Sequence, residues 1–225
     1  MLRLIAEKRI KRSLQAKEAG VDALREILHE MKEGGATSEF ANQVREREKS
    51  RKQARAILTG IDKAARLSRK EFLSLYGELA GGLWYSGGLQ RSKTRIANHP
   101  DVFQQIVRTA ARHHTGDIAE IFESLRKLAN QVPGIGPNIL TEILQTYDGN
   151  RYAIMNQNSV AGMLLAGFRD FPETPNRQSV DGHLYKTFCQ RAESIRQKLR
   201  LGDLSQLDAV FNYAYWRDQE KAGED

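Results

Sequence analysis

Cysteine is nearly absent from this chain of 225 residues, which contains only Cys189. A single thiol excludes an intrachain disulfide and any zinc or iron–sulfur site made from cysteines alone. Because Cys189 lies in an apolar helical pattern, we expect it to be a packing residue. The adjacent His113 and His114 would point about 100° apart on a helix, which makes them poor co-ligands. We therefore expect no metal and no other cofactor.

Long apolar runs are also missing. Charged residues begin at Arg3, which leaves no apolar segment typical of a signal peptide. No apolar run approaches the length of about 20 residues that a membrane-spanning helix needs. We therefore expect a soluble protein of a reducing, cytoplasmic compartment, without a membrane partner.

The two-residue alternation of a β-strand is not convincing anywhere, whereas apolar residues recur at helical spacing over most of the chain. This pattern predicts an all-α fold, which we expect to consist of two intimately packed helical lobes. Residues 1–67 form a basic N-terminal helical region, with a first helical stretch over residues 2–32. Residues 68–225 form the second helical domain, and the two together are expected to make one compact, monomeric unit.

Positive charge exceeds negative charge, because 35 Lys and Arg residues face 28 Asp and Glu residues and leave a net charge of +7. This balance favours a polyanionic partner. The segment from Val44 to Lys70 is especially basic. It predicts either a strip facing nucleic-acid phosphates or a solvated helix face, since Glu46, Glu48 and Asp62 are interleaved.

The most informative stretch is Val132–Leu140, with the sequence Val-Pro-Gly-Ile-Gly-Pro-Asn-Ile-Leu. Apolar residues at helical spacing precede it and follow it, which predicts two helices joined by a glycine turn. Gly134 and Gly136 permit a tight turn, and Pro137 suits the first turn of a helix. Free amides of such a turn, at the positive end of a helix dipole, make a site for one phosphate.

Val132–Leu140 resembles the helix-hairpin-helix motif of DNA repair proteins, and residues from about 70 to 216 resemble the helix-hairpin-helix DNA glycosylase superfamily. The resemblance implies that double-stranded DNA is the partner and that a flipped base is excised to leave an abasic site. It also implies that hairpin carbonyls could hold an alkali ion. Members that nick the strand carry a lysine just after the hairpin glycines, where this chain has Pro137 and Asn138. A monofunctional enzyme is therefore implied. The expected contacts of the hairpin with DNA come from Pro133, Gly134, Ile135, Gly136 and Asn138.

A second glycine-rich stretch, residues 81–93, surrounds two aromatic side chains. Trp84 and Tyr85 could line a base pocket, since glycines allow close approach and aromatic rings stack on a flipped base. Arg91 and Lys93 close the stretch and are candidates for contact with DNA. The alternative is that Trp84 and Tyr85 are core residues beside a flexible connection.

Two residues compete for the catalytic position beside the sugar, where the resemblance implies an aspartate that caps a helix. Asn156 matches by position, 24 residues after Val132, but its amide is neutral and stabilises a developing cation weakly. Asp181 matches by type, because Val180-Asp181-Gly182-His183 resembles the Val-Asp-x-His pattern of the superfamily. Lys186 follows it as a further candidate for DNA contact. The alternative for Asp181 is an ordinary N-cap.

A different class of function remains open. The asparagine at the expected aspartate position favours a non-catalytic helix-hairpin-helix DNA-binding module, as in a repair or restriction complex. An RNA- or ribosome-associated helical protein is a third possibility and is based on net charge alone. The sequence does not identify which base would be excised, because base pockets are assembled from separated segments.

Overall fold

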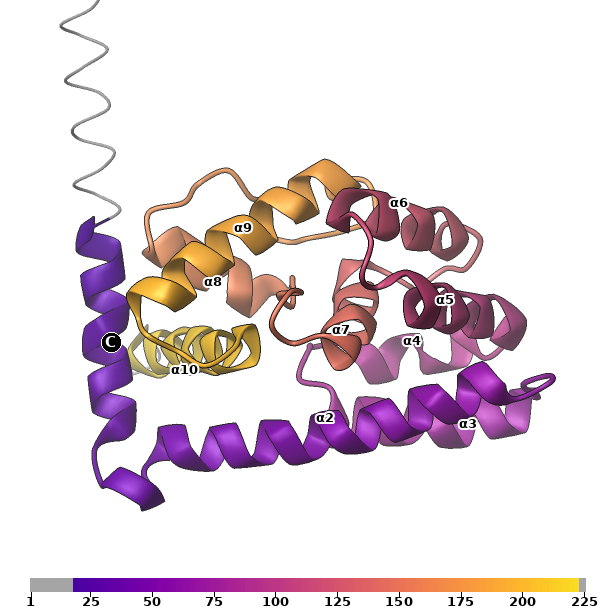
Figure 1. Ribbon diagram of the computed structural model, residues 1–225, viewed down its shortest axis with the longest axis horizontal. Coiled ribbons are helices and arrows are strands. Elements are labelled where there is room, and N and C mark those ends of the chain that lie inside the picture. Colours follow the sequence, from indigo (N-terminus) through magenta and orange to yellow (C-terminus); the bar gives the residue numbers. More distant parts are fainter. Residues whose placement is uncertain (1–17, 223–225) are drawn as a thin grey trace, which may run out of the picture.

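The computed structural model describes residues 18–222, and all regular secondary structure in this range is helical (Figure 1). This confirms the predicted all-α class. The first helix covers residues 18–32, and the part of the predicted 2–32 stretch before residue 18 lies outside the described residues. Within residues 18–222 no helix is both long and apolar enough to cross a membrane.

The remaining elements follow one another through short connections, except for the longer loop before α9. They are η1 (Gly35–Thr37), α2 (Glu39–Lys63), α3 (Arg69–Glu78), η2 (Leu79–Leu83), α4 (Leu89–Ile96), α5 (Pro100–His113), α6 (Ile118–Ala129), α7 (Pro137–Tyr147), α8 (Gln157–Leu165), α9 (Gly182–Lys198) and α10 (Leu204–Ala222).

Several helices begin where local sequence signals predict. Ser38 caps α2 by accepting a hydrogen bond from the backbone amide of Ala41. Ser68 and Glu71 form a reciprocal capping box at the start of α3. Pro100 occupies the first turn of α5, where a backbone N–H has no acceptor within the helix, so the missing N–H of proline costs no hydrogen bond. These helix starts therefore depend on side chains within three residues of the boundary.

The long helix α2 runs along one side of the molecule, and the helix of residues 18–32 crosses its end (Figure 1). Gly20 lies against the end of α8, because a Cβ built there would be 2.3 Å from the carbonyl oxygen of Leu165. Tyr213 of α10 donates a 2.6 Å hydrogen bond to Glu30. One continuous cluster of buried apolar side chains extends from Val21 to Ala214. The described part of the basic N-terminal region is therefore packed into the same core as the rest.

Helix α7 lies at the centre of this packing, between α2, α5 and α6. Every one of its residues except Asn138 is buried, although the helix carries several polar side chains. The buried polar residues are Thr141, Glu142, Gln145 and Thr146. Buried polar groups require hydrogen-bond partners, and the partners found here organise the candidate site.

Candidate functional site

Helices α6 and α7 flank the glycine turn, called the hairpin below, as the helical spacing on either side of it predicts. Gly134 has a φ of +102°, in the region that favours glycine, and Gly136 is extended and caps α7. Val132 and Ile135 are fully buried and anchor the turn from below, whereas Pro133 is exposed. The turn therefore presents its backbone at the surface on an apolar base.

Three backbone amides of this turn are available to a ligand. Within residues 18–222, the N–H groups of Gly134, Gly136 and Asn138 have no hydrogen-bond acceptor, whereas the N–H of Ile135 donates to Val132. The free donors stand at the N-terminal end of α7, where the helix dipole favours an anion. The arrangement is suited to one phosphate.

The carbonyl side of the same turn is held by a residue that the sequence did not single out. Arg177, from the loop before α9, donates to the carbonyl oxygens of Ala129 and Val132 at 3.3 and 3.2 Å. Because these two oxygens already accept from a positively charged guanidinium, they are a poor place for an alkali ion. No local pattern marks Arg177, because its partners lie more than forty residues away.

The glycine-rich stretch lies beside the hairpin. Asn138 donates from Nδ2 to the carbonyl oxygen of Gly87 at 3.3 Å. On the other side of the turn, Ser92 of α4 approaches Gly134 so closely that a Cβ there would be 3.2 Å from the serine side chain. Arg91 and Lys93 flank Ser92 on α4, and Arg91 is exposed. The structure therefore brings residues 86–93 and the hairpin to one surface.

The two aromatic residues of the stretch have different surroundings. Trp84 is only 4% exposed, donates from Nε1 to the hydroxyl of Thr146 at 3.2 Å, and packs edge-on against Tyr76. Trp84 is therefore a core residue in this conformation, which is the alternative that its sequence left open. Tyr85 is half-buried, and its hydroxyl lies 3.2 Å from the hydroxyl of Ser50. Tyr85 remains the aromatic candidate for a base pocket.

The basic segment of α2 was predicted to face either phosphates or solvent, and Arg47 does neither. Arg47 is buried, forms a 2.5 Å ion pair with Asp208 of α10, and stacks on the Tyr85 ring at 4.2 Å. The prediction that it faces phosphates or solvent is therefore wrong for this residue. Arg51 also turns inward, to a 2.7 Å ion pair with Asp203. Exposed positive charge on α2 comes from other positions, including Lys49 and Lys52.

Asn156 lies beside the glycine-rich stretch and caps α8. Its Oδ1 accepts from the amide of Ser159 at 2.9 Å, and its own N–H donates to the Ser159 hydroxyl at 2.9 Å. Its Nδ2 donates to the hydroxyl of Ser86 at 3.3 Å. The half-buried side chain is thus held between its own helix and the segment that also contacts the hairpin.

Glu142 is a site residue that sequence reasoning missed. It is 3% exposed, and its Oε1 accepts from the amides of Tyr85 and Ser86 at 2.9 and 2.7 Å. Burial, followed by the nearby carboxylate of Asp208, raises the pKa of Glu142 to about 7, while the bonds to Ser86 and the charge of Arg47 oppose this rise. The sequence did contain a signal for this residue, because Glu142 is a charged residue within the apolar helical pattern that follows the hairpin.

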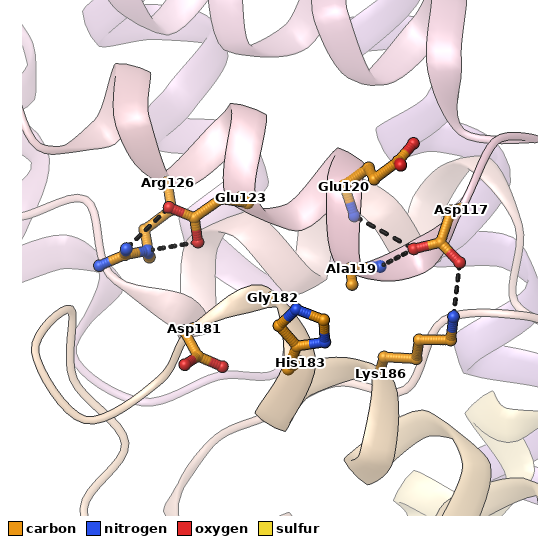
Figure 2. A pocket seen from close by; sticks show the side chains of 9 residues that line it. All are labelled: Asp117, Ala119, Glu120, Glu123, Arg126, Asp181, Gly182, His183 and Lys186. Carbon is orange, nitrogen blue, oxygen red and sulfur yellow. Dashed lines mark hydrogen bonds and ion pairs between the residues drawn. The ribbon is translucent and has the colours of Figure 1, made fainter.

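Asp181 lies in a separate pocket of about 620 Å³ between α6 and α9 (Figure 2). Its Oδ1 accepts from the amide of Leu184 at 2.8 Å, so it caps α9. Lys186, one turn further along α9, forms a 2.6 Å ion pair with Asp117. That contact lowers the pKa of Asp117 below its usual value, aided by backbone amides at the start of α6. Lys186 therefore already has a carboxylate partner.

The residues that line this pocket come from the start of α9 and from residues 117–126. None of them belongs to the hairpin, the glycine-rich stretch or α8. Among the described residues, no group of three or more metal-ligating side chains is placed to hold a metal ion. The structure thus links Asn156 to the hairpin through residues 86–87, whereas Asp181 and Lys186 line a pocket whose Arg126 reaches the hairpin through Arg177. Comparison of the chain with protein-family models, curated proteins and solved structures finds no match.

Proposed function

We propose that this protein is a monofunctional DNA glycosylase, which binds duplex DNA and hydrolyses the N-glycosidic bond of a flipped base. The observation that supports this most is the cluster around α7. Three free amides of the hairpin, the glycine-rich stretch and the capping residue Asn156 adjoin one another there. In such an enzyme the hairpin anchors a backbone phosphate while neighbouring segments hold the displaced nucleotide.

The hairpin and α4 supply the DNA-binding surface in this proposal. The amides of Gly134, Gly136 and Asn138 bind one phosphate, and Arg91 extends the contact along the backbone. The exposed lysines of α2 add a weaker, sequence-independent attraction. Binding should therefore weaken steeply as salt concentration rises. The two helical lobes of the superfamily, with a cleft between them, remain part of this proposal.

Asn156 is the preferred sugar-side residue, because it lies with the hairpin and the glycine-rich stretch. Its amide can orient the attacking water through hydrogen bonds, and the proton from that water passes to the departing base or to solvent. Tyr85 would stack on the base. Asp181 can take the sugar-side role only if the flipped nucleotide reaches the pocket between α6 and α9.

The test is the formation of abasic sites on duplexes that carry uracil, alkylated, oxidised or hypermodified cytosine bases. Alkali then cleaves the abasic product. We expect Asn156→Ala to abolish product and Asp181→Asn to leave it intact. Asn156→Asp should raise the rate, since aspartate is an equally good N-cap and adds a carboxylate beside the sugar. Product that survives Asn156→Ala but disappears in Asp181→Asn would reverse the assignment.

A non-catalytic DNA-binding module is the second candidate. The neutral side chain of Asn156 favours it, since its Oδ1 and backbone are already engaged in capping α8. This module would show salt-sensitive binding of duplex DNA that depends on Gly134 and Gly136, without abasic product on any duplex. A preference for RNA over duplex DNA would contradict both candidates.

A further inference from the structure

Glu142 has no role in the proposed phosphate contact or at the sugar, yet its carboxyl is buried within the cluster. It sits in the middle of α7, and one of its carboxyl oxygens accepts two successive backbone amides, those of Tyr85 and Ser86. Hydrogen bonds to a carboxylate are shorter and stronger than those to neutral acceptors. A single side chain therefore fixes the backbone of the two residues that face the candidate site.

Charged and titratable groups from several elements surround this carboxyl. Arg47 of α2 and Asp208 of α10 act on its charge, and Tyr76 of α3 interacts with it electrostatically. Arg47 is only partly satisfied, because its Nε and Nη2 are buried and have no partner among the described residues. Because Arg47 is already paired with Asp208, it compensates the charge of Glu142 only in part, and protonation of Glu142 changes the strength of both backbone bonds.

The segment that Glu142 holds carries both features expected to meet a nucleotide. Tyr85 supplies the aromatic ring, which stacks on the guanidinium of Arg47. The hydroxyl of Ser86 accepts from Nδ2 of Asn156 at 3.3 Å. A continuous chain of hydrogen bonds thus runs from the carboxyl of Glu142, through the Ser86 residue, to the side chain of Asn156.

We propose that Glu142 is a positioning residue, which sets the Asn156 side-chain amide in place through the backbone of Tyr85 and Ser86. The effect on catalysis rests on the proposed glycosylase activity, whereas the coupling between the side chains of Glu142 and Asn156 does not depend on it. Near neutral pH the carboxyl exchanges between its charged and neutral forms, so the coupling makes the orientation of Asn156 depend on pH. A purely structural acid would leave Asn156 unaffected by titration.

The test is NMR of the full chain, following the backbone amides of Tyr85 and Ser86 and the side-chain amide of Asn156 from pH 5 to pH 9. In the wild-type protein we expect all three signals to titrate together, with a midpoint near 7. In Glu142→Gln, which keeps an acceptor oxygen, that transition should disappear. The control Glu46→Gln removes an exposed carboxylate next to Arg47 and should leave the transition unchanged.

Ser86→Ala separates the two halves of the chain of hydrogen bonds. It retains both backbone bonds to Glu142 but removes the Ser86 hydroxyl, which lowers the pKa of Glu142. The amides at positions 85 and 86 should therefore still titrate, with a higher midpoint, while Asn156 no longer follows. A wild-type Asn156 signal that does not titrate with the two amides would overturn the proposal. So would an Asn156 signal that still follows them in Ser86→Ala.

Excision provides the functional readout. If the wild-type protein forms abasic product, Glu142→Gln should lower the rate of the chemical step by on the order of tenfold to a hundredfold, with unchanged duplex affinity. An equal loss of affinity in this variant would show that Glu142 supports binding instead of positioning. If the wild-type protein forms no product, the proposed function fails, and the NMR titration still decides whether Glu142 and Asn156 are coupled.

Discussion

Replacing Glu142 by glutamine should change how the free energy of unfolding depends on pH. The carboxyl has a pKa of about 7 in the folded protein, against an ordinary value of 4.5. The folded state therefore holds the proton more tightly than the unfolded state does. The stabilisation from this proton is fully present below pH 4.5 and is lost as the pH rises through 7.

The magnitude follows from the size of this pKa change. Each pKa unit corresponds to about 1.4 kcal/mol, so the wild-type protein should lose about 3 kcal/mol of stability from this group between pH 4.5 and pH 8. Glutamine cannot ionise and resembles the protonated acid, so Glu142→Gln should lack this loss. The carboxyls with lowered pKa, such as Glu71 and Asp117, act at more acidic pH and are common to both proteins.

Urea unfolding followed by tryptophan fluorescence, at intervals between pH 5 and pH 8, measures the quantity directly. The informative value is the difference between wild type and Glu142→Gln, because contributions from groups that do not interact with Glu142 cancel. Glu46→Gln serves as the control and should run parallel to the wild type. Parallel curves for wild type and Glu142→Gln would refute the assignment of a raised pKa to this carboxyl.

Three further outcomes are expected. Gly134→Ala places a side chain at a φ of +102° and should cost about 1–3 kcal/mol while weakening duplex binding in a filter or fluorescence assay. The control Gly60→Ala, in α2 with open space around it, should instead stabilise by up to about 1 kcal/mol and leave binding unchanged. Arg47→Met leaves the carboxylate of Asp208 buried without its partner and should lower the free energy of unfolding by about 3–5 kcal/mol, measured by thermal or urea unfolding. A loss below about 1 kcal/mol would contradict the buried ion pair. Burial raises the pKa of the Cys189 thiol to about 11, so alkylation of the native protein at pH 8 should be far slower than in urea, and equal rates would show that the thiol is accessible.

The sequence predicted the features of this fold that depend on nearby residues. Ser38 and Ser68 start helices because the amides they cap lie three residues away. The glycine turn was predictable for the same reason, since the positive φ of Gly134 and the place of Pro137 in the first turn of α7 follow from residue types within one short stretch. Local free energies of about 1 kcal/mol decide such boundaries, and they do not require knowledge of the rest of the chain.

Contacts between distant segments were not predictable in this way. Arg47 lies in a segment rich in basic residues, and its burial is determined by Asp208, 161 positions later. The same limit applies to Glu142, whose partners precede it by 56 and 57 positions. A charged side chain in an amphipathic pattern is usually exposed, and only a partner elsewhere in the fold makes its burial tolerable.

The choice between Asn156 and Asp181 shows what such contacts contribute to functional reasoning. Both residues cap a helix, and each accepts a hydrogen bond from the amide three positions later, so their local signals are equivalent. Residue type favours Asp181, because a carboxylate stabilises a developing cation better than an amide does. The proposed chemistry also requires that the group lie near the segment proposed to hold the DNA backbone. Asn156 bonds directly to Ser86, next to the Gly87 that contacts the hairpin, whereas the Asp181 pocket is linked to the hairpin through Arg126 and Arg177. If a glycosylase acts at this surface, the accurate placement of the Asn156 amide must compensate for the missing carboxylate. Glu142, which holds the backbone of Ser86, would then matter for catalysis although it does not touch the substrate.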